Sequence, residues 1–77
     1  MINWKDYIIV DKGIQNGKPV IKNTRITVEL ILDKLAEGES VEQLLESHPK
    51  ITKESILACL SFASDSLKNE ITYSLAS

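Results

Sequence analysis

Residues 27–45 read TVELILDKLAEGESVEQLL, and they contain the clearest structural signals in this 77-residue chain. Apolar side chains in their first half recur at i, i+3, i+4 and i+7: these are Val28, Ile31, Leu32 and Leu35. This spacing is typical of the buried stripe of an α-helix. Thr27 suits the N-cap position, and Gly38 suits the left-handed position that ends many helices. The sequence therefore predicts a helix between Thr27 and Gly38.

Two further helices are predicted after the first. Residues 40–43, SVEQ, have the pattern of a capping box, and Pro49 ends that helix because proline drives the residue before it out of the helical region. Thr52 suits the N-cap of a third helix. The apolar residues of this helix keep a helical rhythm: Ile56, Leu60, Ala63, Leu67 and Ile71. Neither glycine nor proline occurs in residues 51–77, so the helix is predicted to extend beyond the body of the domain, and a break near Asn69 is left open.

The residues before the first helix predict a short β segment. Residues 7–10, YIIV, form a β-branched and aromatic run that is typical of a strand. Asn16 and Gly17 are a strong signal for a turn between strands because both residues accept positive φ. Residues 19–21 offer a second short strand, and its proline suits the start or the edge of a sheet.

The chain is predicted to form one domain of the mainly α class over residues 1–77. A short β-hairpin or β segment (1–26) precedes a three-helix, helix-turn-helix or homeodomain-like bundle (27–77). A domain of this size buries only about 60% of the surface that its unfolded chain exposes. The lone Cys59 and the lone His48 provide neither a disulfide nor a metal cluster. We therefore expect no metal and no cofactor, and a partner subunit rather than an unusually good helical core.

Composition and charge indicate a cytoplasmic protein that is not dedicated to nucleic acid. No apolar run approaches the roughly 20 residues of a membrane span, and the first residues lack the apolar core of a signal peptide. Residues 1–27 carry five lysines and arginines against two aspartates, whereas residues 28–49 carry one lysine against six carboxylates. Dedicated nucleic-acid binders usually have a net basic domain or face, so strong autonomous DNA binding is not expected.

Three ordered segments carry a family resemblance. They are residues 17–26 (GKPVIKNTRI), residues 38–45 (GESVEQLL) and residues 49–56 (PKITKESI). In this order they resemble the domain-of-unknown-function 433 family, whose pattern begins G-x-P-x-I-x-G-T-R-I and continues with a helix, a G-x-S-x-E-x-L turn and a P-x-l-T-x-e-x-I segment. Asn23 stands where the family usually has glycine. Asparagine is the next most tolerated residue at positive φ, so the turn is expected to survive.

The resemblance implies a homeodomain-like helical bundle and an antitoxin of the VapB type, paired with a PIN-like ribonuclease toxin. The first hypothesis is therefore a non-enzymatic regulator that binds and neutralises such a toxin and contacts operator DNA as a homodimer. The second is a protein–protein interaction or dimerisation module without a nucleic-acid role. The acidic middle and the long apolar third helix fit this second hypothesis as well as the first. No nucleophile or paired carboxylate has a catalytic spacing, so an enzyme is not expected.

Residues 40–60 have the form of a helix-turn-helix, in which the second helix places its N-terminal residues against DNA bases. The DNA-contact candidates are Lys50, Thr52, Lys53 and Ser55. The alternative is a packed bundle whose exposed face has no ligand. Nearby carboxylates at Glu42, Glu46 and Glu54 would repel phosphates, so any DNA binding is expected to be weak and salt-dependent.

The basic N-terminal third offers a second set of contacts, to nucleic acid or to the acidic active site of a nuclease partner. Its candidates are Lys18, Lys22 and Arg25. For Arg25 the alternative is a local ion pair with Glu29, four residues later. A third set continues the apolar series of the last helix and predicts a dimer or partner interface: Leu67, Ile71, Tyr73 and Leu75.

Overall fold

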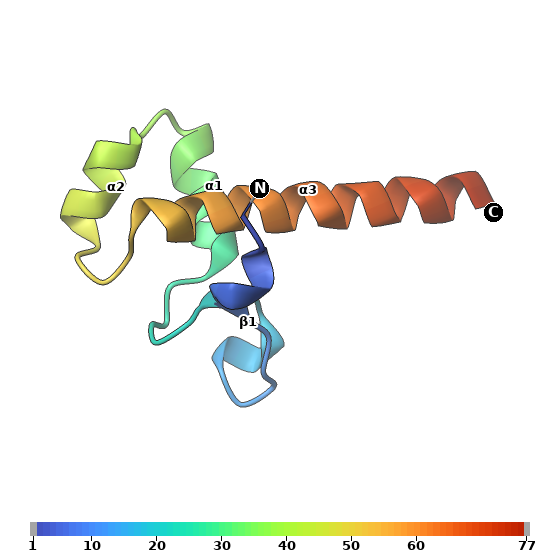
Figure 1. The fold of residues 1–77 in the computed structure, drawn as a ribbon, viewed down its shortest axis with the longest axis horizontal. Helices are drawn as coiled ribbons and strands as arrows, with labels where there is room; N and C mark the ends of the chain where they lie inside the picture. Colours follow the sequence, from blue (N-terminus) through green and yellow to red (C-terminus); the bar gives the residue numbers. More distant parts are fainter. Residues whose placement is uncertain (1, 77) are drawn as a thin grey trace.

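The computed structural model describes the backbone of residues 2–76 and the side chains of residues 2–69. Its elements follow one another in this order: η1 (Trp4–Asp6), β1 (Ile8–Ile9), η2 (Gln15–Gly17), β2 (Val20–Ile21), α1 (Val28–Ala36), α2 (Val41–Ser47) and α3 (Lys53–Ala76). Three helices thus follow a short two-stranded sheet, which confirms the predicted fold class at this level. In Figure 1, α3 lies across the molecule; α1 passes behind its first half, α2 lies beside its start, and the β segment lies below it.

The sheet pairs β1 with β2 in antiparallel fashion, with Ile8 opposite Ile21 and Ile9 opposite Val20. Both strands are only two residues long, and the connection between them contains η2 rather than a two-residue turn. Asn16 and Gly17 nevertheless have the positive φ values predicted for them, 57° and 84°. The chain then turns back, so that residues 26–28 run along the other edge of β2.

Hydrogen bonds on this second edge join the β segment to α1. The Ile21 amide donates to the Ile26 carbonyl over 2.9 Å, and the Val28 amide donates to the Pro19 carbonyl over 3.0 Å. This pairing was not predicted. It places the start of α1 directly beside the sheet.

The three predicted helix N-caps are confirmed. The Leu30 amide donates to Thr27 Oγ1 at 3.0 Å, and Ser40 and Gln43 form both bonds of a capping box. The Ser55 amide donates to Thr52 Oγ1 at 3.1 Å. Gly38, with φ of 98°, follows the end of α1 as predicted. Each cap satisfies amides that a helix start would otherwise leave unpaired.

α3 runs from Lys53 to Ala76 without the break that was left open near Asn69. It extends well past α1 and α2 (Figure 1), and this gives the molecule dimensions of 43 × 30 × 23 Å. Within the described residues, no helix is long and apolar enough to span a membrane.

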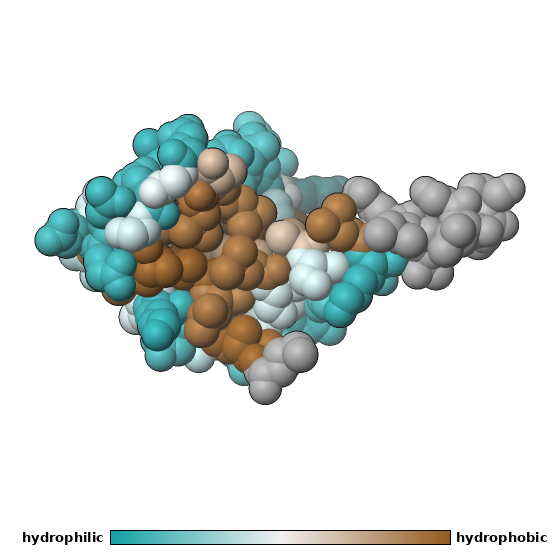
Figure 2. Space-filling model, turned by 90° about the horizontal axis from the view of Figure 1, so that it is seen from above, coloured by the Kyte–Doolittle hydropathy of each residue, from teal (hydrophilic) through white to brown (hydrophobic). Residues whose placement is uncertain are grey.

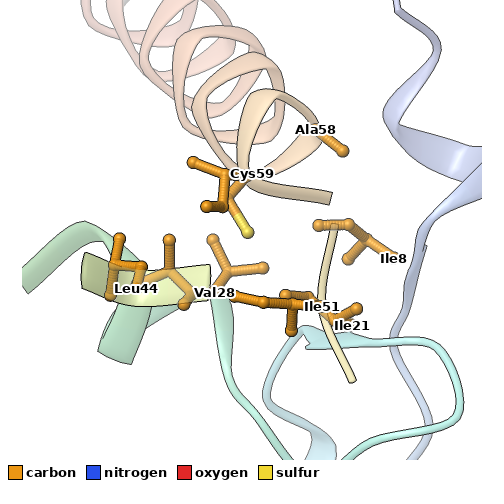
Figure 3. Close-up of a cluster of buried hydrophobic side chains, with 9 residues drawn as sticks. Ile8, Ile21, Val28, Leu44, Ile51, Ala58 and Cys59 are labelled. Carbon is orange, nitrogen blue, oxygen red and sulfur yellow. The ribbon is translucent and has the colours of Figure 1, made fainter. Parts of the chain in front are cut away.

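The core gathers side chains from both strands, all three helices and the α2–α3 connection. Its buried members are Ile8, Val20, Ile21, Val28, Ile31, Leu44, Ile51, Ile56, Ala58 and Cys59. Figure 3 shows Cys59 of α3 pointing toward Val28, with Ile8 of β1 close to Ile21 and Ile51. Leu60 and Leu67, which belong to the same apolar series as Ile56, do not join them and stay 46% and 59% exposed.

The N-terminal segment is fastened to α3. The indole nitrogen of Trp4 donates to Asp65 Oδ2 at 2.8 Å, and its ring meets that of Phe62 edge to face, with centroids 4.8 Å apart. Trp4 and Tyr7 both pack against the core. The segment before β1 thus covers one side of α3.

Candidate functional site

A surface groove of about 810 Å³ lies where the β segment meets the α2–α3 connection. We call it the basic groove; its lining residues are Ile9, Ile14, Lys22, Asn23, Thr24, Arg25, Ile26 and Lys50. Three of them carry a positive charge and none carries a negative one. The groove therefore unites Lys22 and Arg25 with Lys50, which the sequence assigned to two separate candidate sets.

The charged side of the groove is built on a tight turn after β2. Asn23 adopts φ of 65°, the left-handed conformation predicted for it. The Thr24 hydroxyl donates to the Ile21 carbonyl at 2.7 Å and accepts from the Ile26 amide at 3.0 Å. These two bonds use the hydroxyl within the turn. Lys22 and Arg25, which flank Asn23 and Thr24, remain exposed.

Among residues 2–69, the three positive charges of the groove form no ion pair. Over the part that the structure describes, the ion pairs found are Lys18 with Glu29 at 3.1 Å and Lys34 with Glu39 at 3.8 Å. Glu29 thus pairs with Lys18 rather than with Arg25, so the alternative local partner of Arg25 is taken by another residue. Exposed cations that pair with no carboxylate of residues 2–69 are available to an external anion.

The groove also has an apolar part and a basic extension. Ile9, Ile14 and Ile26 are half-buried along it. A smaller adjoining hollow of about 360 Å³ shares Ile14 and Arg25 and adds Lys12. A ligand here would meet apolar surface and several cations at once, which suits an acidic protein surface better than a bare ion.

The remaining DNA-contact candidates are placed differently. Lys53 is exposed at the start of α3. The Thr52 hydroxyl is used in the helix cap, and Ser55 is only 5% exposed, with its hydroxyl 3.0 Å from that of Thr52. Ser55 therefore cannot reach a groove of DNA. The Thr-x-x-Ser spacing of a reciprocal cap was a signal for this role, because the third helical residue commonly bonds back to the N-cap.

The other residues predicted to make contacts lie in different parts of the molecule. Lys18 lies outside the basic groove, paired with Glu29 beside α1. Leu67 is exposed on α3. Ile71, Tyr73 and Leu75 fall within α3, but their side chains lie outside the described residues.

The two residues with classical metal or redox chemistry lie apart from the groove. Cys59 is fully buried in the core, and this burial raises the pKa of its thiol from 9.0 to about 11. His48 is half-buried at the end of α2. No cluster of three or more metal-ligating side chains occurs among the residues that the structure describes.

Comparison with known proteins decides the family. Residues 8–63 match the family described as "Protein of unknown function (DUF433)". The chain belongs to this family. A crystal structure of a DUF433 member protein from Anabaena variabilis ATCC 29413 is similar to it, with a TM-score of 0.77 and 25% sequence identity over 95% of this chain and 71% of that one. No curated protein matches the sequence.

The matched region of this DUF433 chain contains the whole basic groove, from Ile9 to Lys50. It also contains the turn at Asn23 and the three helix caps. The match ends at residue 63, so the second half of α3 lies beyond it.

Proposed function

We propose that this chain is an antitoxin-like regulator of the VapB type that binds and neutralises a PIN-like ribonuclease toxin. The basic groove carries this proposal, because it presents Lys22, Arg25 and Lys50 without a carboxylate among its lining residues. Nucleases of the PIN-like class hold metal ions with clustered carboxylates. A groove of opposite charge is complementary to such a site, and charge complementarity favours both fast association and the correct partner.

Arg25 is the central contact in this proposal. Its planar guanidinium can donate two parallel hydrogen bonds to one carboxylate. The turn that carries it is held by both hydrogen bonds of the Thr24 hydroxyl, so little backbone freedom is lost on binding. Arg25 also lines both the groove and its extension toward Lys12.

Operator DNA is a secondary ligand in this proposal. In a homeodomain-like reading, α2 and α3 form the helix-turn-helix, with Lys50 and Lys53 exposed near the start of the second helix. The exposed side chains that follow are Glu54, Leu57 and Leu60. One acidic and two apolar residues contribute little to phosphate binding, so the isolated protein binds DNA weakly. The proposed regulator acts in the cytoplasm and has no enzymatic activity.

The test is co-expression with the product of the adjacent gene, followed by affinity measurement on the purified proteins. Arg25→Ala is expected to weaken toxin binding by a factor of about 30 or more, because loss of one partner of a buried charge pair costs roughly 2–5 kcal/mol. Its melting temperature should change little, since the Arg25 side chain is exposed.

Lys18→Ala is the matched control. It also removes one exposed cation of the N-terminal third, but from outside the groove, so toxin binding should stay within about twofold, as expected for a surface ion pair. If both variants bind the toxin as the wild type does, the basic groove is not the toxin-binding surface.

A further inference from the structure

A second surface lies on α3. Four exposed residues follow one another on this helix at spacings of three, four and three: Leu57, Leu60, Ser64 and Leu67. We call this surface the leucine seam. Its three leucines are 43%, 46% and 59% exposed. An alternating three–four spacing of apolar residues is typical of helices that pack against another helix, so the exposure of these leucines is unexpected for a monomer.

In the part of the chain that the structure describes, all four seam residues are exposed to solvent. Trp4 contacts α3 through Phe62 and Asp65, and Cys59 points into the core. None of these three positions belongs to the three–four series. Figure 2 shows a patch of hydrophobic surface near the middle of the face that it presents, bordered by hydrophilic surface. Large contiguous apolar patches are rare on monomers and mark interaction sites.

The charges that flank the seam identify its occupant. Glu54 and Lys68 are both exposed and lie on the same side of the seam, 14 residues apart in sequence. We propose that a second copy of this chain covers the leucine seam, with the two α3 helices antiparallel. Leu57 then faces the partner's Leu67, and Leu60 faces the partner's Ser64.

In this register Glu54 lies beside the partner's Lys68, and the twofold axis repeats the pair. A parallel arrangement lacks this complementarity, because it brings Lys68 beside the partner's Ala63. The antiparallel dimer also shares no residue with the basic groove. Both grooves therefore remain open, and the inference stands independently of the proposed function.

The first experiment measures the dimer dissociation constant of the full chain by sedimentation equilibrium. Leu67→Asp places a charge in the seam and is expected to raise this constant by a factor of about 30 or more, as for a central interface residue. Val10→Asp is the matched control because Val10, at 56% exposure, is as exposed as Leu67 but lies on the β segment; its dissociation constant should not change. A wild-type chain that stays monomeric at millimolar concentration overturns the proposal, as does a dimer that Leu67→Asp leaves intact.

The second experiment tests the orientation. Glu54→Lys and Lys68→Glu each place like charges together twice in the dimer, and each should weaken it by about 3- to 10-fold. The double variant restores opposite charges and should dimerise like the wild type, and an equimolar mixture of the two single variants should form a heterodimer. Circular dichroism verifies that each variant keeps its helical content. If the double variant dimerises more weakly than both single variants, the antiparallel register is wrong.

Discussion

The basic groove and the leucine seam are both exposed, but the chain builds them in opposite ways. The groove combines a turn after β2 with Lys50 from the α2–α3 connection, so it exists only when the sheet and the helices are packed together. The seam needs only that α3 is helical, because all four of its residues lie within 11 positions of one helix. The proposed partner binding through the groove would therefore depend on global stability, whereas the proposed pairing through the seam would depend on local helical structure.

Ile21→Ala is expected to destabilise the fold that builds the groove more than any other variant considered. Ile21 is 3% exposed in the core, and its carbonyl anchors the turn that presents Arg25. Truncation of a buried isoleucine to alanine costs about 2–5 kcal/mol, a large share of the stability of a small domain. Urea denaturation monitored by Trp4 fluorescence measures this loss. Val10→Ala, at an exposed site of the same β segment, should change the free energy of unfolding by less than about 0.5 kcal/mol; equal losses for both variants would mean that the core does not hold the turn.

Cys59, on the buried face of α3, provides a test whose expected effect on the free energy of unfolding is intermediate. Burial raises the pKa of its thiol from 9.0 to about 11, so the folded state holds this proton more tightly than the unfolded state. Its contribution is complete below pH 9 and is lost between pH 9 and pH 11, by about 2–3 kcal/mol. The measurement is the free energy of unfolding across this range for the wild type and for Cys59→Ala. Equal pH dependence in the two proteins would contradict the assignment to Cys59.

The variant with the smallest expected effect distinguishes the basic groove from the leucine seam most clearly. Thr24→Ala removes the hydrogen bonds at 2.7 and 3.0 Å that close the turn, at a cost of about 1–2 kcal/mol. It should weaken toxin binding through the loosened Arg25 and leave seam-mediated dimerisation unchanged. Thr24→Ser keeps the hydroxyl and should retain both stability and toxin binding. A Thr24→Ala variant that loses dimerisation and toxin binding equally would show that the two surfaces are coupled.

Features that depend on neighbours in sequence could be predicted. The caps at Thr27, Ser40 and Thr52 join residues three apart, so their chemistry is contained in four consecutive residues. The left-handed conformation of Asn23 was expected because asparagine stands where the family pattern has glycine and is the next most tolerated residue at positive φ. The helix count and the order of sheet and helices follow from these same local signals.

Features that depend on packing could not be predicted in the same way. Lys50 joins Lys22 and Arg25 only because the α2–α3 connection folds beside the β2 turn. Ser55 was grouped with surface residues because its position at the start of a helix suggested DNA contact, whereas packing buries it. Periodicity alone also placed Leu60 in the same series as Ile56. It could not indicate which side of a long helix would remain uncovered.

The hydrogen bond between Trp4 and Asp65 has a consequence for how the protein is made. Its two ends are 61 residues apart, and closing a loop of that length has a substantial entropic cost. On the ribosome the N-terminal segment must wait until α3 has been synthesised through Phe62 and Asp65 before it can dock. The helical caps can form as each segment emerges, whereas the contact between the N-terminal segment and α3 forms only after this part of α3 has been made.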